Sequence, residues 1–434
     1  MTAQMYVCLG IFVFMILGYC FAGKLKTTTG VVALCTIVLT IYSGLVEPKD
    51  VLPNFSNANV ILILSMFIVA AGLNRTQAVS KMSAMVYRFS HGNFTAMLAG
   101  YILLTFFLAN FVPSPLAVYA IVCPLVANMC KECGVSPSKA MFPICLVDVG
   151  TCAALPIASG AVTFATMNGY LESYGYTEFQ MEILDSFIGR APVVIVVLLY
   201  ALFIAPKLCP SQPSVAILSD SSESGKKEAV PLNAWREFLG YFIFIMTTLA
   251  LIFQEQLGLT SWQIALTGAA VVVASGVLSP REAVNAIPVR IMLLLIAALT
   301  VGGAMVSSGL GDLIGNTLAA ALGGTTNGYV IGAVFFVIPF ILTQVMQNQS
   351  VSNIFIPIVI LTCKALHCNP VGPLILLTAA CLTAFLTPMA TPVIPVVMDA
   401  GGYTMKDLFK MGLLPSLIIP VVSVFWVMTV FPAY

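Results

Sequence analysis

Four short segments place helix-breaking or polar residues inside otherwise apolar runs: 110–115, 156–160, 343–350 and 387–392. Three contain Pro or Gly, which interrupt a helix, and the fourth is rich in amide side chains. A helix N-terminus attracts an anion, whereas unwound carbonyls with Ser, Thr and Asn oxygens suit a small hard cation. No segment contains a basic residue. We therefore expect an anion and a coupling cation to be held without a buried Lys or Arg.

The candidate ligands follow from these residue types. For the anion we select groups at the breaks: Ser114, Ser159, Gln347, Asn348, Gln349 and Thr391. For the cation we select side-chain oxygens and unwound carbonyls: Asn110, Ser114, Pro156, Gly160, Thr343, Asn348, Thr387 and Ala390. The alternative is that the breaks are kinks and loops packed inside the protein, because Gly and Pro are frequent in transmembrane helices.

Asp148 is a further candidate cation-binding residue. It lies in the middle of an apolar segment, between Leu146 and Gly150. A charged carboxylate at the centre of a bilayer costs about 2.5–3.5 kcal/mol on insertion scales. Our hypothesis is that Asp148 binds a proton or a cation. The alternatives are a neutral, hydrogen-bonded carboxyl with a structural role, or a carboxyl near the water interface.

The elements that position these residues must lie in a membrane. Of the 434 residues, 60% are hydrophobic and 8% are charged, against about 25% charged in soluble domains. This composition excludes a soluble enzyme, a nucleic-acid binder and a disordered scaffold. The 18 Lys and Arg balance 17 Asp and Glu, so there is no basic field for nucleic acid. We interpret the 12 Cys as small apolar residues of helices, with disulfides or metal ligation as the lesser alternative.

The chain contains an internal repeat. The segment 44–50 matches 276–282 at an offset of 232, and 156–159 matches 388–391 at the same offset. Such a constant offset indicates a duplicated unit; chance matching of apolar sequence is the alternative. We predict a first half over 1–205, a polar cytoplasmic linker over 206–231, and a second half over 232–434.

Apolar runs long enough to cross a bilayer recur in both halves, and the runs 94–131 and 328–362 are broken near their middle. We predict an all-α integral membrane protein with two inverted-topology repeats, about ten transmembrane helices and two re-entrant helical hairpins. With the N-terminus outside, nearly all Lys and Arg fall inside, and Lys49, Arg190 and Lys364 fall outside. We therefore expect both termini on the extracytoplasmic side of the cell (inner) membrane. If the run 94–131 crossed the membrane twice as two ordinary helices, instead of forming a re-entrant hairpin, the Lys and Arg would lie on the same sides.

The repeat and its breaks are typical of secondary transporters. A channel would need a continuous polar path, whereas the polar residues cluster at the breaks. A membrane-embedded enzyme would need a motif such as HExxH or an Asp pair at midplane, and neither is present. The segment 75–92 mixes basic and apolar residues at helical spacing and predicts an interfacial helix, with a counterpart at about 309–323.

Two segments resemble the divalent anion:sodium symporter family. The first is segment 343–349, which is followed further along the chain by Pro357 and Ile358. The second is segment 379–392. The resemblance extends more weakly over both halves. It implies a homodimeric, elevator-type carrier of the ion transporter superfamily. Such a carrier moves di- or tricarboxylates or sulfate with sodium, and each half gives one hairpin and one sodium site.

The sequence resembles a divergent member of that family. Ser114, Thr343 and Asn348 match the family's residues, but Pro115 and Leu116 replace an Asn and a Thr in the first hairpin. The first sodium site and the dicarboxylate specificity are therefore open. The alternative is a proton-coupled or uncoupled carrier, or a channel, for another small anion or polar solute. We expect Na⁺ or H⁺ as the coupling ion, no other cofactor, and lipid but no nucleic acid as partner.

Overall fold

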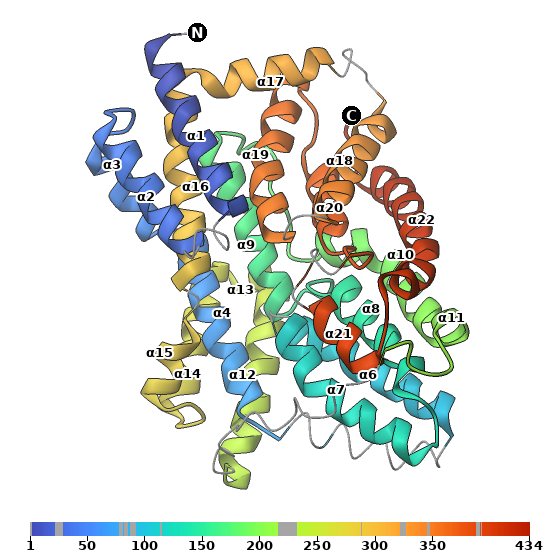
Figure 1. Ribbon diagram of the computed structural model, residues 1–434. Coiled ribbons are helices and arrows are strands. Elements are labelled where there is room, and N and C mark those ends of the chain that lie inside the picture. The colour runs from blue at the N-terminus through green and yellow to red at the C-terminus, as the bar shows by residue number, and fades with distance from the viewer. Residues whose placement is uncertain are drawn as a thin grey trace.

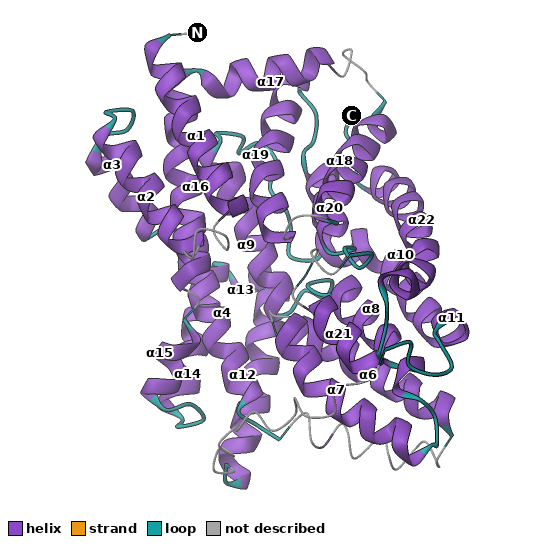
Figure 2. Cartoon of the chain, in the orientation of Figure 1, coloured by secondary structure: helices purple, strands orange, loops and turns teal. Residues whose placement is uncertain are grey.

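The computed structural model describes residues 2–21, 29–77, 81, 86, 93–112, 115–215, 232–287, 289–321, 327–344, 348–387, 391 and 393–434. These residues form helices and connecting loops, with no strand among them (Figures 1 and 2). The all-α prediction is confirmed.

Among the described residues, the first half contains nine helices of eight residues or more and a few short turns. In chain order they are α1 (Ala3–Phe21), α2 (Thr29–Tyr42), α3 (Pro48–Phe55), α4 (Ala58–Asn74), α6 (Phe94–Phe111), α7 (Pro115–Glu132), a 3₁₀ turn (Pro137–Lys139), α8 (Met141–Thr151), α9 (Ala158–Ser173) and α10 (Asp185–Leu199). A π-helical turn (Tyr200–Ile204) then leads into α11 (Ala205–Leu208).

The second half repeats this series. It comprises α12 (Ala234–Ile252), α13 (Gln254–Leu257), α14 (Ser261–Ala274), α15 (Pro280–Ala286), α16 (Val289–Ser308), α17 (Leu310–Ala321), α18 (Gly328–Thr343), α19 (Asn348–Leu366), α20 (Val371–Cys381), α21 (Val393–Gly401) and α22 (Met405–Val430). The starts of α2 and α14, the starts of α3 and α15, and the ends of α6 and α18 are each 232 residues apart. This agreement supports the predicted duplication.

The helices pack into two bundles (Figure 1). Bundle 1, on the left of Figure 1, contains α1–α4, α12 and α14–α16, with α4 against α14 and α2 against α16. Bundle 2, on the right, contains α6–α8, α10, α18 and α20–α22. Between them lie α9, which packs on α4 and α16, and α19, which packs on α17 and α20. All four predicted breaks therefore lie in bundle 2 or beside it.

Several helices have the length and composition of membrane spans. Among the described residues, six helical stretches are long and apolar enough to cross a bilayer: Pro48–Asn74, Phe94–Phe111, Pro115–Glu132, Asp185–Leu208, Ala234–Ile252 and Met405–Val430. Large apolar side chains such as Phe242, Leu417 and Phe425 lie exposed on them, as lipid-facing residues do. The predicted interfacial segment 75–92 lies largely outside the described residues, but its counterpart forms the helix α17.

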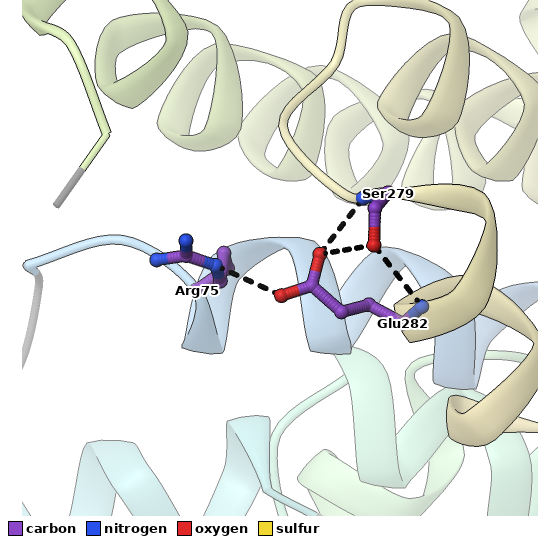
Figure 3. Close-up of polar contacts among 3 residues, drawn as sticks. All are labelled: Arg75, Ser279 and Glu282. Carbon is purple, nitrogen blue, oxygen red and sulfur yellow. Dashed lines mark hydrogen bonds and ion pairs between the residues drawn. The ribbon is translucent and has the colours of Figure 1, made fainter. Parts of the chain in front are cut away.

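An ion pair joins the two halves within bundle 1 (Figure 3). Arg75, at the end of α4, donates from Nε to Glu282 Oε1 of α15 at 3.1 Å. The other carboxylate oxygen of Glu282 accepts from the backbone N–H and the hydroxyl of Ser279, both at 2.8 Å. Ser279 and Glu282 form the capping box of α15, which fixes the carboxylate for Arg75.

The equivalent place in the other half lacks this ion pair. Residue 307, which follows Arg75 by 232 positions, is Ser, and its hydroxyl donates to Leu45 O at 3.1 Å. Asp50 is the equivalent of Glu282. A cavity of about 490 Å³ opens there, and its lining includes Glu47, Asp50, Asn54, Glu172 and Ser307. The short Ser side chain thus leaves open a space that the guanidinium occupies in the other half.

Candidate functional site

The first break is organised by the amide of Asn110, at the end of α6. Its Nδ2 donates to Phe106 O, one turn earlier, at 2.8 Å. Its Oδ1 accepts from the backbone N–H of Leu155 at 2.8 Å, in the unwound segment between α8 and α9. The side chain is fully buried. The predicted cation ligand Asn110 therefore also ties the first hairpin to the broken helix.

The unwound segment itself is tightly turned. Ala153 and Ala158 have positive φ angles of 55° and 21°, which side chains other than Gly rarely adopt. A Cβ on Gly160 would lie 1.9 Å from Leu155 O, so only Gly fits there. The buried hydroxyl of Ser159 donates to Asn110 O at 2.9 Å. Ser159, Gly160 and half-buried Pro156 therefore lie in the segment that Asn110 holds.

The second break is organised by Gln344, which follows the last residue of α18. Its Nε2 donates to Phe340 O at 3.2 Å, and its Oε1 accepts from Leu386 N–H at 3.2 Å. The hydroxyl of Thr387 donates to Gln344 O. The predicted cation ligand Thr387 therefore lies against the second hairpin.

Asn110 and Gln344 play the same role in the two halves, and we call each set of bonds an amide clamp. In each clamp the nitrogen binds a carbonyl four residues earlier, and the oxygen binds an N–H of the segment that follows α8 or α20. A hydroxyl, of Ser159 or Thr387, binds the backbone oxygen of the clamp residue. The sequence predictions did not select Gln344. The signal was present, since an amide precedes the turn of both hairpins, but the two are 234 residues apart rather than 232.

The turn of the second hairpin holds two predicted cation ligands together. Thr343, fully buried, donates from its hydroxyl to Asn348 Oδ1 at 2.7 Å. Asn348 is the first residue of α19, where backbone N–H groups lack partners within the helix. Thr391 is buried, and its carbonyl accepts from Ile394 N–H at the start of α21. Ser114, Gln347 and Ala390, and the side chain of Gln349, lie outside the described residues.

Asp148 lies on α8 with its side chain fully buried. Neither carboxylate oxygen has a hydrogen-bond partner within the described part of the chain. Met141, two turns earlier on α8, contacts the hydroxyl of Tyr119, one turn into α7. Asp148 lies two turns, or about 10 Å, further along α8 than Met141. Among the described residues, no polar contact links its carboxyl to the clamps.

A buried guanidinium lies at the end of α8. Arg190, from α10, is 1% exposed. It donates from Nη1 to Cys152 O at 2.6 Å and from Nη2 to Gly150 O at 2.9 Å. It therefore covers the carbonyls that α8 leaves free. Arg190 thus brings a buried basic side chain to this break from a separate helix, although none of the four segments itself contains a basic residue.

Comparisons with known proteins agree with this architecture. The family model described as citrate transporter (CitMHS) matches residues 12–262 and 241–433. An uncharacterized transporter of Synechocystis is 27% identical over 40% of this chain and 28% of its own length. The sodium-dependent dicarboxylate transporter SdcS of Staphylococcus aureus is 22% identical over 92% of this chain and 81% of its own.

Two solved structures share the fold. The YdaH transporter of Alcanivorax borkumensis has a TM-score of 0.66 at 16% identity and covers 88% of both chains. MtrF of Neisseria gonorrhoeae has a TM-score of 0.61 at 13% identity, over 87% of this chain and 82% of its own. The predicted class, a membrane transporter and not an enzyme, is confirmed by the family match.

Proposed function

Because the chain belongs to the citrate transporter family, we propose that it is a secondary active carrier of di- or tricarboxylate anions, driven by a cation gradient. The sodium-dependent dicarboxylate transporter of Staphylococcus aureus, which aligns over most of this chain, supports both the substrate class and the ion. The chain would act as an elevator, in which bundle 2 moves along bundle 1.

The pair of amide clamps carries this proposal. Each clamp holds a hairpin turn against an unwound stretch, so that free helix ends and carbonyls from both halves are kept at two matching breaks. Fixed backbone groups of this kind bind small ions in transporters without a dedicated charged pocket. A passive pore would not need two helix breaks with the same pattern of hydrogen bonds.

The substrate would bind where helix N-termini and hydroxyl groups meet. The starts of α9 and α19 offer N–H groups at Ser159 and Asn348, and a helix N-terminus stabilises a carboxylate. Thr391, together with Ser114, Gln347 and Gln349, completes the proposed anion site. Sodium would bind at the second break, where Thr343, Asn348 and Thr387 supply oxygens, with the backbone of Ala390 beside them.

The arrangement of the bundles supports an elevator motion. The α6–α7 hairpin lies in the lower part of Figure 1 and the α18–α19 hairpin in the upper part. Hairpins that enter from opposite ends are what inverted repeats require. Bundle 1 would stay fixed and form the homodimer contact, and α17 and the segment 75–92 would connect the bundles. Both termini would lie on the extracytoplasmic side.

Asp148 would carry a proton in place of the first sodium ion. Its oxygens have no hydrogen-bond partner among the described residues, and a buried carboxylate without a partner is strongly disfavoured. The acid is therefore protonated in this conformation. It would release the proton when bundle 2 moves and water reaches α8.

Uptake into proteoliposomes tests the proposal. Labelled succinate or citrate should accumulate under an inward sodium gradient and fail to accumulate in potassium-matched vesicles. Asn348→Ala should abolish accumulation, because Thr343 loses its acceptor and α19 loses its first side chain. An absence of accumulation of both anions by folded, inserted protein, under sodium and proton gradients alike, would overturn the proposal.

A further inference from the structure

The hairpin arms α7 and α19 end in the same kind of turn. At the end of α19, Cys368 N–H donates to Cys363 O at 3.0 Å, and His367 N–H donates to Lys364 O at 3.2 Å. These two bonds define a Schellman motif, in which the first and sixth residues come side by side. The turn therefore makes neighbours of Cys363 and Cys368.

The thiol groups of these two cysteines both lie buried inside the protein and are free. Cys363 is 0% exposed and Cys368 is 1% exposed. The Cys363 thiol hydrogen-bonds to the sulfur of Cys368. A disulfide needs the sulfurs to approach to about 2.05 Å, and a pair already in contact needs only a small shift of side chains.

The turn at the end of α7 gives an internal comparison. There Val135 N–H donates to Cys130 O at 2.9 Å, and Gly134 N–H donates to Lys131 O at 3.2 Å. Cys130 is the counterpart of Cys363, but Val135 occupies the place of Cys368. The second half therefore has a thiol at the position that faces the first cysteine, and the first half has an apolar side chain there.

The two turns face different redox compartments in the proposed orientation. The end of α7 is inside and the end of α19 is outside, and this sidedness belongs to the proposed function on which the inference rests. Paired thiols persist in a reducing cytosol and are oxidised outside it. We propose that Cys363 and Cys368 form a disulfide at the extracytoplasmic end of the second hairpin.

The chemistry is thiol–disulfide exchange with a disulfide-bonded oxidant, either a small molecule or an oxidoreductase. The thiolate of Cys368 attacks one oxidant sulfur and releases the other as a thiol. The thiolate of Cys363 then attacks the mixed disulfide at Cys368 and releases the second thiol. The two cysteine protons end on the released thiols, and two electrons reduce the oxidant.

Cys368 is suited to the attacking role. The hydrogen bond from Cys363 lowers the pKa of the Cys368 thiol, which lies in the loop after α19. Access is controlled by Tyr434, which hydrogen-bonds to the same sulfur and is 54% exposed. The non-helical segment from Phe431 to Tyr434 is also held near the pair by a bond from Asn369 N–H to Ala433 O at 2.9 Å. Opening of that segment exposes Cys368.

The disulfide would fix the turn at the outer end of α19, which contacts the loop after α9. The hydroxyl of Tyr176 donates to Cys368 O at 2.8 Å, and Lys364 Nζ donates to Tyr174 O at 3.3 Å. Both tyrosines follow the end of α9. The oxidised pair would therefore hold a point at which three segments meet.

Differential alkylation in intact membranes tests the inference. Membranes are quenched with acid, denatured, treated with N-ethylmaleimide before any reduction, and digested with trypsin and chymotrypsin. Cleavage after Lys364 separates the two cysteines, so their peptides stay joined before reduction only if they are bonded. We expect the two peptides to be joined by the disulfide before reduction, with neither cysteine alkylated. Free alkylation of both residues, even after treatment of the membranes with oxidised glutathione, would overturn the inference.

Two internal references sharpen the result. Cys368→Val recreates the Cys130–Val135 pair of the first half. Cys363 then has no partner thiol and should be alkylated by N-ethylmaleimide before reduction. Cys130 and Cys133, a Cys-x-x-Cys pair at the inner end, should alkylate without reduction. Oxidised Cys130 with free Cys363 would reject both the inference and the proposed orientation. Free Cys363 and Cys368 in a protein that accumulates succinate would reject the disulfide alone.

Discussion

Gln344 and Asn110 bind the protein in the same way from opposite halves of the chain. Each amide oxygen accepts a backbone N–H from an unwound segment, that of Leu155 at 2.8 Å and that of Leu386 at 3.2 Å. The two residues differ by one methylene group, and their positions differ from the repeat offset by two residues. The bonding pattern is therefore kept while the exact position and side chain vary.

Removing either clamp should disable transport. Asn110→Ala leaves the Leu155 N–H without its acceptor, and an unsatisfied buried group of this kind costs about 1–3 kcal/mol. We expect succinate uptake to fall at least about tenfold, and Gln344→Ala to do the same from the other half. Asn128→Ala, on an exposed face of α7, is the matched control. Normal uptake in both clamp variants would contradict the role of the clamps.

Gly160→Ala should damage the first break. The added Cβ would lie 1.9 Å from Leu155 O, so the segment between α8 and α9 must shift, and Leu155 loses its place beside Asn110. Thermal unfolding of the purified protein should occur at a lower temperature, and uptake should be lost. Gly10→Ala on α1, where nothing lies within 4 Å, should change neither. Equal behaviour of the two variants would mean that the break tolerates rearrangement.

Asp148→Asn should separate binding from coupling. The amide has the size of the neutral acid but cannot release a proton, so net accumulation driven by a pH gradient should disappear. Exchange of labelled for unlabelled substrate at equal pH should continue, because the described contacts of Asp148 include no hydrogen bond that the change would break. Asp399→Asn, at an exposed position, is the control. Gradient-driven uptake that survives in Asp148→Asn would remove Asp148 from coupling.

The link between α4 and α15 should weaken in acid. The Ser279 backbone N–H, and then the Ser279 hydroxyl and Arg75, hold the pKa of the Glu282 carboxyl below its usual value. A depressed pKa stabilises the fold above the unfolded-state pKa, and this contribution is lost as the pH falls through the folded-state pKa. The difference in unfolding temperature between wild type and Glu282→Gln should be largest near neutral pH and vanish in acid. A pH-independent difference would exclude ionisation as its cause.

The sequence predicts the helices well because their signals are local. The apolar runs predicted helices by their length, and the repeated segments 44–50 and 276–282 contain Pro48 and Pro280, which are the first helical residues of α3 and α15. The breaks near Asn110 and Pro156 were predicted for the same reason. Their hydrogen-bond partners were not, because Leu155 is 45 residues from Asn110, and no local pattern reports such a contact.

Arg190 shows a different limit of sequence reasoning. The positive-inside rule assigned Arg190 to the outer side but does not tell what surrounds its side chain. The structure buries this side chain against Gly150 O and Cys152 O. Free helix carbonyls can replace water around a guanidinium, and the sequence of α10 does not contain that information.

The difference between Arg75 and Ser307 makes the two halves of the chain unequal at one matching position. If inward-open and outward-open states are related by exchange of the two halves, identical halves would give the two states equal energy. Here one half has the Arg75–Glu282 pair and the other has Ser307 beside a cavity of about 490 Å³. Each 1.4 kcal/mol of difference changes the ratio of two populations about tenfold. In the proposed elevator, this difference would give the unloaded carrier a preferred resting side only if the contacts of Arg75, where α4 leads into the segment 75–92, change as the bundles move.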